Sequence, residues 1–466
     1  MGKYYLAVDI GASGGRHILG SIKDGSIQLE EVHRFENGMI KKDGHLCWDL
    51  ESLYREIKKG LIKCRQAGKI PESMSVDTWG VDYVMLNKEN QVIGRTYGYR
   101  DKRTKGMDKE VYKYFSPEEL YARTGIQKQI YNTIYQLMSV KTQEPENMER
   151  AESLLMLPDY FHFLLTGNKV SDYTNATTGQ LVSPVTKEWD YELIGALGYK
   201  KEMFIPLSTP GTQVGSFRKE VAQEVGFQCQ AVLAPTHDTA SAVVAVPSVS
   251  EECLYISSGT WSLMGIENQK AICTMESMEK NFTNEGGYNY RFRYLKNITG
   301  LWIIQSVRNE MGKIHSFSEL CDLAKQEKNF PSRINVNDDC FLAPDSMIEE
   351  IQNYCRRTGQ EVPKSAGQLA AVTYQSLAES YAKTVKEIED ITGKTFKAIY
   401  IVGGGSNADY LNKLTAIKSG RTVYAGPTEA TAIGNLAVQM IEAGEFEDLQ
   451  KVRACIYRSF GVVEYK

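Results

Sequence analysis

One short pattern occurs twice in this chain of 466 residues and limits what the chain can fold into. An apolar strand, a turn of small residues and a second apolar strand make up LAVDIGASGGRHILG at residues 6–20. CLYISSGTWSLMGI, at residues 253–266, repeats this arrangement around Gly259. Two strands that flank a glycine turn are typical of a hairpin. The repetition predicts two α/β halves that each begin with a hairpin, although two unrelated hairpins would also give this pattern.

The segments that follow each hairpin support two halves. The expected helices are residues 51–64, a helix from the capping box Ser365–Gln368 to Gly393, one with Leu411, Leu414 and Ile417 on one face, and 428–441. The expected strands are a pair within 74–87 around Gly80, then 397–402 and 421–426. Residues 104–225 are expected to be mainly helices and loops. The boundary is expected near Pro247, which gives an N-terminal domain of residues 1–246 and a C-terminal domain of residues 247–466.

Composition excludes several classes of partner. Hydrophobic residues make up 42% of the chain and charged residues 24%, which is ordinary for a globular protein. The net charge is −4 and no Lys/Arg run occurs, so neither nucleic acid nor an acidic membrane is an expected partner. No apolar stretch reaches the roughly 20 residues of a membrane span. Nine scattered cysteines without a CxxC pair predict a reduced, cytoplasmic location, and a monomer or homodimer is expected.

The first glycine turn, Gly11–Arg16, is a candidate phosphate site. Its small residues let backbone N–H groups approach an anion, although the same turn would also serve as a plain tight hairpin. Asp9 stands at the end of the preceding strand. A carboxylate beside a phosphate-sized turn suggests Mg²⁺, which binds few protein ligands together with phosphates and waters.

A third glycine turn, GGGSNA at residues 403–408, matches the G-x-G-x-x-A pattern of dinucleotide-binding proteins. That alternative requires an acidic residue at the end of the next strand, where this chain has TVYAG. The turn therefore fits better beneath the ribose and adenine of a nucleotide than in an NAD site.

Asp238 is the candidate reactive carboxylate. It lies in APTHDTASAV, residues 234–243, where a strand passes into an alanine-rich helix. Asp is a common N-cap, so a purely structural role is the alternative. Three glycine turns favour a nucleotide site, and a helix dipole is expected to keep Asp238 ionised. An ionised carboxylate can accept the proton of a hydroxyl as a phosphoryl group is transferred to it.

The ordered set of these segments resembles the FGGY carbohydrate kinases, of the actin-like and hexokinase-like ATPase superfamily. The resemblance covers essentially the whole chain. The segments that carry it are DTWGVDYVML at 77–86, YRDKRT at 99–104, APTHDTASAV at 234–243, YISSGTWSLMG at 255–265 and AGPTEATAIGN at 425–435. DTWGVD and HDTASAV are most similar to the members of the family that act on L-rhamnulose.

The resemblance implies two ribonuclease-H-like α/β domains with a nucleotide cleft between them. It also implies transfer of the γ-phosphoryl group of ATP, with Mg²⁺, to the primary hydroxyl of L-rhamnulose. Asp238 would be the general base and Asp9 would hold Mg²⁺ through water. The residues implied to contact the sugar are Gly80, His237, Asp238 and Thr239, and those implied to contact ATP are Ser13, Gly14, Gly15, Arg16, Thr260, Asn297, Gln305 and Gly404.

Three functions remain open from the sequence. They are a kinase for L-rhamnulose, a kinase for another ketose such as L-fuculose or D-xylulose, and a sugar-sensing relative without catalysis. The intact Asp238 argues against the last. The residues alone, without the resemblance, indicate a two-domain nucleotide-dependent enzyme with a carboxylate at its site.

Overall fold

The computed structural model describes residues 2–248, 250 and 252–466. The chain forms two compact units that are not continuous in sequence. The first unit contains the residues up to Ala245, Glu267–Tyr294 and Thr431–Cys455, and the second contains Val246–Ile266, Leu295–Ala430 and Ile456–Lys466. The division into domains of residues 1–246 and 247–466 stays a prediction beside this interleaved path.

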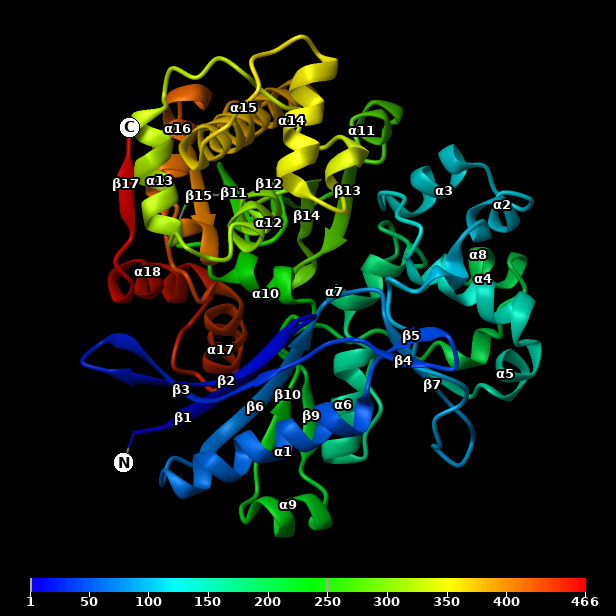
Figure 1. Ribbon diagram of the computed structural model, residues 1–466. Coiled ribbons are helices and arrows are strands. Elements are labelled where there is room, and N and C mark those ends of the chain that lie inside the picture. Colours follow the sequence, from blue (N-terminus) through cyan, green and yellow to red (C-terminus); the bar gives the residue numbers. More distant parts are fainter. Residues whose placement is uncertain (1, 249, 251) are drawn as a thin grey trace. The chain divides into compact units, whose positions relative to one another are not determined.

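A six-stranded mixed sheet forms the centre of the first unit (Figure 1). Its strands, in spatial order, are β3 (Ser26–Glu36), β2 (Gly14–Lys23), β1 (Tyr4–Gly11), β6 (Pro71–Thr78), β10 (Gln230–Val232) and β9 (Gln213–Ser216). The middle strands β1, β6 and β10 run parallel, and the outer pairs are antiparallel. The carboxyl ends of three neighbouring strands therefore meet at one edge of the sheet.

Alternation along β6 separates the two faces of this sheet, because successive side chains of a strand point to opposite sides. Met74 and Val76 belong to an apolar cluster with Ile57 of α1 (Leu50–Gln66) and Phe161 of α6 (Leu157–Thr166). The polar side chains of Ser73 and Asp77 instead bond to α17 (Ala430–Glu442). Helices α1 and α6 thus cover one face, and α17 covers the other.

A second hydrophobic cluster of the first unit is formed by side chains of residues 83–204. Residues 104–225 are mainly helices and loops, as expected. The other helices of the first unit are α2 (Met107–Val111), α3 (Pro117–Thr124), α4 (Thr133–Gln143), α5 (Pro145–Arg150), α7 (Tyr173–Ala176), α8 (Tyr191–Ala196), α9 (Lys219–Val225), α10 (Asp238–Val244) and α11 (Met275–Glu279). Two short ribbons add β4 (Ile40–Lys42) with β5 (His45–Cys47), and β7 (Tyr83–Leu86) with β8 (Ser153–Met156). The strand β13 (Phe282–Gly286) also belongs to this unit.

The sheet of the second unit follows the same plan. The strands of this sheet, in spatial order, are β13, β14 (Phe292–Ile298), β12 (Ser262–Asn268), β11 (Cys253–Ser258), β15 (Ala398–Val402), β16 (Thr422–Ala425) and β17 (Val463–Tyr465), of which β13 is grouped with the first unit. In both units the first strand pairs antiparallel with the second across a hairpin and parallel with a later strand. The repeated hairpin predicted from the sequence is confirmed, and it opens an equivalent sheet each time.

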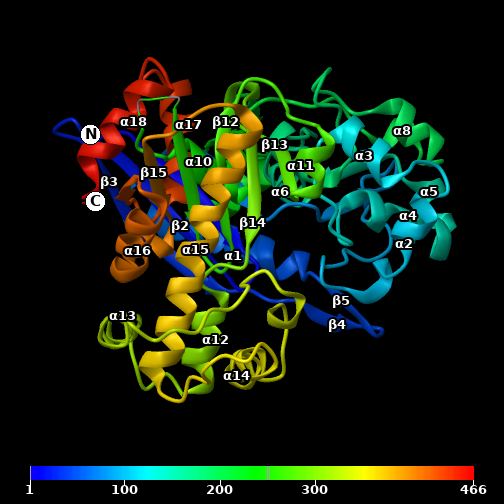
Figure 2. The same cartoon turned by 90° about the horizontal axis from the view of Figure 1, so that it is seen from above.

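The long helix α15 (Ala366–Thr392) organises the second unit (Figure 2), with α13 (Phe317–Gln326) and α16 (Asp409–Ser419) packed against it. Its expected capping box at Ser365 and Gln368 and its C-terminal Gly393 are confirmed. The other helices are α12 (Trp302–Glu310), α14 (Met347–Arg357) and α18 (Leu449–Ser459), the last of which spans both units.

Residues 74–87 form the two strands expected on either side of Gly80, where β6 lies in the large sheet and β7 pairs with β8. One other expectation needs correction. Ile417 was expected on one apolar face with Leu411 and Leu414, and Leu411 is buried, but Ile417 is 59% exposed because the buried face of α16 continues through Thr415 and Ala416.

Candidate active site

Three acidic residues gather at the carboxyl ends of β1, β6 and β10. Asp9 lies directly opposite Asp77 across the parallel pair of β1 and β6. Thr78, the next residue, forms a bridge with His237, and its amide donates to the carbonyl of Thr236 (2.9 Å). Asp238 follows at the start of α10. This edge of a parallel sheet is where α/β proteins commonly bind ligands.

Asp238 is held by one of its two oxygens. Helix α10 begins at Asp238, and His237 occupies the N-cap position without a side-chain capping bond. Oδ1 of Asp238 accepts from the amide of Thr239 (2.6 Å) and from its hydroxyl (3.1 Å), and Nε2 of His237 lies 3.3 Å from the same oxygen. Within the part of the chain that the structure describes, no hydrogen bond reaches Oδ2.

The expectation that a helix dipole keeps Asp238 ionised needs correction. Burial and the negative charge of Asp9 raise the pKa of Asp238 to about 7, against the lowering effect of the two bonds from Thr239. Desolvation and a like charge both disfavour the anion, and here they outweigh the dipole of a seven-residue helix. A carboxylate with this pKa can gain and lose a proton near neutral pH.

The segment before Asp238 is fixed by a buried carboxylate. Oδ2 of Asp172 accepts from the amide (3.1 Å) and the hydroxyl (3.0 Å) of Thr236, and from the hydroxyl of Thr174. The hydroxyl of Ser241 in α10 donates to the carbonyl of Pro235 (2.7 Å). These bonds hold the backbone on both sides of His237 and Asp238.

Asp9 pairs with Arg16, its cross-strand partner in the first hairpin. Nε and Nη2 of Arg16 donate to Oδ2 of Asp9 at 3.1 and 3.0 Å. Oδ1 of Asp9 receives no hydrogen bond from the residues that the structure describes. Among those residues, no group of three His, Cys, Asp or Glu side chains could hold a metal ion. One free carboxylate oxygen fits Mg²⁺ held through water and phosphate, rather than in a cage of protein ligands.

Asp77 is a member of the acidic group that sequence reasoning missed, although it begins the DTWGVD segment. Its Oδ2 accepts from Nδ2 of Asn435 on α17 (2.6 Å), while its Oδ1 is buried without a partner. Burial and the charge of Asp9 raise the pKa of Asp77 well above its ordinary value. Asn435 is in turn held by Gln439, whose amide donates to its Oδ1 (2.7 Å).

The backbone at Gly80 and Val81 is held in an unusual conformation. Val81 has a φ of +68°, which a β-branched residue rarely adopts. Two hydrogen bonds hold this conformation. The amide of Val81 donates to Oγ1 of Thr178 (2.9 Å), and Oγ1 of Thr133 donates to the carbonyl of Val81 (2.8 Å). A Cβ at Gly80 would lie 2.8 Å from Thr178 Cγ2. Such strain is common at ligand sites, which fits the contact with sugar expected of Gly80.

Asp82 supports this loop, and both of its carboxylate oxygens accept hydrogen bonds from neighbouring groups. Oδ2 accepts from the indoles of Trp48 (2.6 Å) and Trp79 (2.9 Å). The amide of Tyr99 donates to the same oxygen (3.1 Å), and Gln136 donates to Oδ1 (2.9 Å). The two indole rings pack with centroids 4.1 Å apart. We therefore assign Asp82 a structural role.

The first predicted phosphate turn is shorter than the sequence suggested. Only Ala12 and Ser13 form the turn, and Ser13 is exposed. Gly14, Gly15 and Arg16 belong to β2 and pair with strands on both sides. A side chain at Gly15 would collide with the ring of Phe35, so packing alone requires this glycine.

Two of the residues of the second unit that are expected to contact ATP, Thr260 and Gln305, meet at its hairpin turn. Oγ1 of Thr260 bonds to Oε1 of Gln305 on α12 (3.4 Å), and the amide of Trp302 donates to the carbonyl of Thr260 (3.0 Å). Asn297 lies on β14, and Gly404 begins the short turn after β15. A Cβ at Gly404 would meet nothing within 4 Å, so this glycine borders open space.

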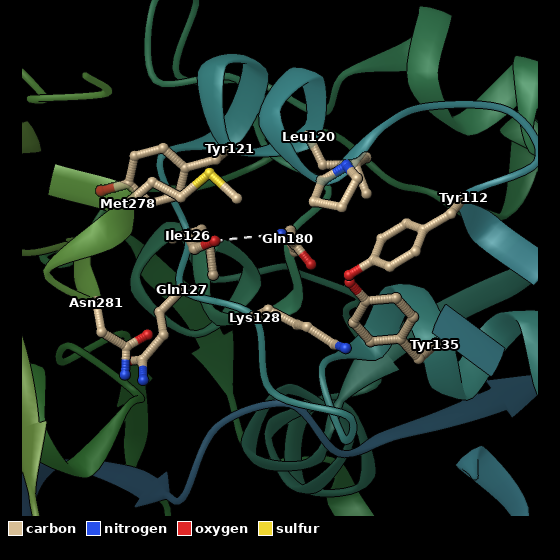
Figure 3. Close-up of a pocket in the computed structure, with 11 residues that line it drawn as sticks. Tyr112, Leu120, Tyr121, Ile126, Gln127, Lys128, Tyr135, Gln180, Met278 and Asn281 are labelled. Carbon is tan, nitrogen blue, oxygen red and sulfur yellow. Dashed lines mark hydrogen bonds between the residues drawn. The ribbon is translucent and has the colours of Figure 1, made fainter. Parts of the chain in front are cut away.

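A cavity of about 130 Å³ lies elsewhere in the first unit, among the rings of Tyr112, Tyr121 and Tyr135 (Figure 3). None of the predicted site residues lines it. Gln180 lines the cavity and directly follows the turn that carries Thr178. Its side chain donates to the carbonyl of Ile126 (3.2 Å). The cavity is therefore separate from the acidic group at the strand ends.

Comparison with known proteins defines the class. Residues 4–245 match the model of the N-terminal domain of the FGGY family of carbohydrate kinases, and residues 254–443 match that of its C-terminal domain. The chain belongs to this family, and it is an ATP-dependent carbohydrate kinase with the two-domain α/β fold expected of one. In the described residues, no helix has both the length and the apolar character to cross a membrane.

Two relatives named rhamnulokinase are similar to this chain over nearly its whole length. Rhamnulokinase of Halalkalibacterium halodurans is 51% identical, over 99% of this chain and 98% of its own. Rhamnulokinase of Bacillus subtilis is 42% identical, over 98% of this chain and 94% of its own. A ligand-bound xylulose kinase from Lactobacillus acidophilus has a TM-score of 0.80 at 16% identity, over 99% of this chain and 93% of its own. Glycerol kinase of Plasmodium falciparum with ADP has a TM-score of 0.79 at 13% identity, over 100% of this chain and 94% of its own. These two structures support the fold alone.

Proposed function

We propose that the chain transfers the γ-phosphoryl group of ATP to the primary hydroxyl of L-rhamnulose, giving L-rhamnulose 1-phosphate and ADP in L-rhamnose catabolism. The observation that carries the proposal is the carboxylate of Asp238 at the strand ends, with Oδ1 bonded and Oδ2 open. The full-length likeness to rhamnulokinases supports the choice of sugar. The reaction takes place in the cytoplasm, where ATP is available, in a monomer or homodimer.

In the proposed reaction, Oδ2 of Asp238 accepts the proton of the sugar hydroxyl as its oxygen bonds to the γ-phosphorus. The bond from that phosphorus to ADP breaks and leaves its electron pair on ADP. Asp9 holds Mg²⁺ through water, and Mg²⁺ neutralises phosphate charge. His237, Thr239 and Gly80 contact the sugar.

Each unit contains residues assigned to ATP. In the first unit they are Ser13, Gly14, Gly15 and Arg16, and in the second they are Thr260, Asn297, Gln305 and Gly404. The ion pair with Asp9 supports a role for Arg16 in holding that carboxylate as well.

The test is an assay of ADP release with L-rhamnulose, L-fuculose, D-xylulose and glycerol. L-Rhamnulose is expected to have the highest kcat/KM, because a site that bonds particular hydroxyls leaves its polar groups unpaired with the wrong sugar. Such discrimination can reach about 10⁴-fold. Equal efficiency on D-xylulose would overturn the choice of sugar, and no turnover of any sugar would favour a sensing role.

A further inference from the structure

A buried arginine lies beside His237 on the far side of its ring from Asp238. Arg293 of β14 is fully buried, at 0% exposure. Its Nη2 donates to Nδ1 of His237 (2.9 Å) and lies 2.9 Å from Oε2 of Glu285 on β13. Its Nε donates to the carbonyl of Gly286 (3.0 Å). All of these residues belong to the first unit.

The contact from Arg293 determines which nitrogen of His237 carries hydrogen. A guanidinium has only N–H donors and no acceptor, so Nδ1 must present its lone pair. Burial and the positive charge of Arg293 hold the pKa of His237 well below its ordinary value, so the ring is neutral. A neutral imidazole with a bare Nδ1 carries its proton on Nε2.

The charged groups around the ring agree with this tautomer. Glu285 Oε2 lies 3.4 Å from Nδ1 and forms an ion pair with Nη2 of Arg293 (2.9 Å), but it accepts no hydrogen bond from the residues that the structure describes. The hydrogen bond from Nη2 goes to Nδ1 of His237. On the other side, Nε2–H faces Oδ1 of Asp238 at 3.3 Å. That oxygen accepts its two hydrogen bonds from Thr239, and the N–H of His237 lies on its other side.

We propose that Arg293 is a positioning residue for phosphoryl transfer. By donating to Nδ1 it fixes His237 as the Nε2–H tautomer, which directs an N–H toward Oδ1 of Asp238 and leaves Oδ2 open to the proton of the sugar hydroxyl. Glu285 holds Arg293 in place. This role rests on the proposed function, in which Asp238 is the base.

The direct test is the tautomer of His237, read by NMR of the full chain labelled with ¹⁵N-histidine and assigned with a His237→Gln variant. The wild type is expected to show a neutral ring protonated at Nε2. Arg293→Met should lose this state, and Arg293→Lys should restore part of it, because an ammonium can still donate to Nδ1. A wild-type ring protonated at Nδ1, or an unchanged tautomer in Arg293→Met, would overturn the proposal.

Kinetics supply the second readout. Arg293→Met is expected to lower kcat about 10- to 100-fold, the usual cost of losing the outer partner of a functional histidine, with KM for ATP changed less than about twofold. Arg123→Met is the matched control. Arg123 is another arginine of the first unit that is held by carboxylates, those of Asp190 and Glu192. Its loss should lower thermal stability but leave the tautomer and kcat as in the wild type.

Two further variants keep the test decisive if Arg293→Met does not fold. The amide nitrogen of Gln reaches the place of Nε2, whereas that of Asn reaches the place of Nδ1. His237→Gln should therefore retain at least about tenfold more kcat than His237→Asn, and equal losses would count against the proposal. The NMR result needs no substrate. A wild type with the Nε2–H tautomer but no activity on L-rhamnulose would contradict the proposed function and leave the tautomer assignment standing.

Discussion

The two oxygens of Asp238 have different surroundings, and this difference separates a catalytic residue from a helix cap. Oδ1 is bonded by Thr239 and faced by His237, whereas Oδ2 is open. A side chain that only capped α10 would bond the amides of the first turn from the N-cap position, which His237 occupies instead.

Asp238→Asn is therefore expected to lower kcat by about 10²–10⁴-fold, because the amide cannot accept the proton of the sugar. The melting temperature should stay within a few degrees of the wild type, since the amide oxygen of Asn can still accept from Thr239. Steady-state kinetics and thermal melts on one preparation would test this, with the exposed Asp322→Asn as control. Retained turnover would exclude Asp238 as the base.

The pKa of Asp238, about 7, gives a second prediction at this scale. The base must be deprotonated to act, so kcat/KM should be constant above about pH 7 and fall about tenfold per pH unit below it. Measurements of kcat/KM between pH 5.5 and 8.5, with stability checked at each pH, would show this fall. A flat profile down to pH 5.5 would mean that no group with this pKa accepts the proton.

Some of the site could be predicted from single residues and some could not. Asp238, His237 and Thr239 adjoin one another in the sequence, so one motif was enough to find them. Asp77 and Arg293 depend on contacts between distant segments, to Asn435 and to His237, which no local pattern encodes. Val81 could not be predicted either, because its left-handed backbone is held by Thr133 and Thr178.

At the scale of elements, local signals predicted helices better than strand pairing. The capping box at Ser365 and the periodic apolar residues of α1 are properties of the segments themselves, and both were confirmed. The two strands around Gly80 were predicted, but the pairing of β7 with β8 depends on a partner about 70 residues away in sequence, and no local pattern encodes it.

The contact of α10 with α17 gives a prediction at this scale. A Cβ at Gly434 would overlap the carbonyl oxygen of Ser241 in α10, so the two helices can approach closely only at a glycine. Gly434→Ala should lower stability by about 1–3 kcal/mol, the usual cost of overpacking, and should lower kcat because it displaces the helix that begins at Asp238.

Denaturant unfolding and kinetics would measure both effects. Gly461→Ala is the control, because a Cβ there meets nothing within 4 Å. If Gly434→Ala matched the wild type in both measurements, the close approach of the two helices would not matter for the site.

At the scale of the whole molecule, the chain changes unit several times. The sheet of the first unit receives α17 from residues 431–455, and Gln439 of that helix donates to the carbonyl of Leu6 in β1 (3.0 Å). Leu436 of the same helix packs against Gly20 of β2. A chain of residues 1–246 alone would leave this face of the sheet uncovered.

Such a truncated chain is expected to lack a cooperative thermal transition and to bind a dye specific for exposed apolar surface. Circular dichroism during heating, beside the full chain at equal concentration, would show this. A sharp transition at the melting temperature of the full chain would mean that the first unit folds without α17.

The late arrival of α17 also has a consequence during synthesis. Domains generally fold as their residues leave the ribosome, at about 5–20 residues per second. The stretch from Ala245 to Cys455 then takes on the order of tens of seconds to translate. Throughout most of that time α17 has not been made, and the sheet of the first unit lacks the helix that covers its second face. Until translation is nearly complete, the side chains of Ser73 and Asp77 on this sheet face therefore lack their partners Gln439 and Asn435, so the first unit can reach its final structure only when almost the whole chain has been made.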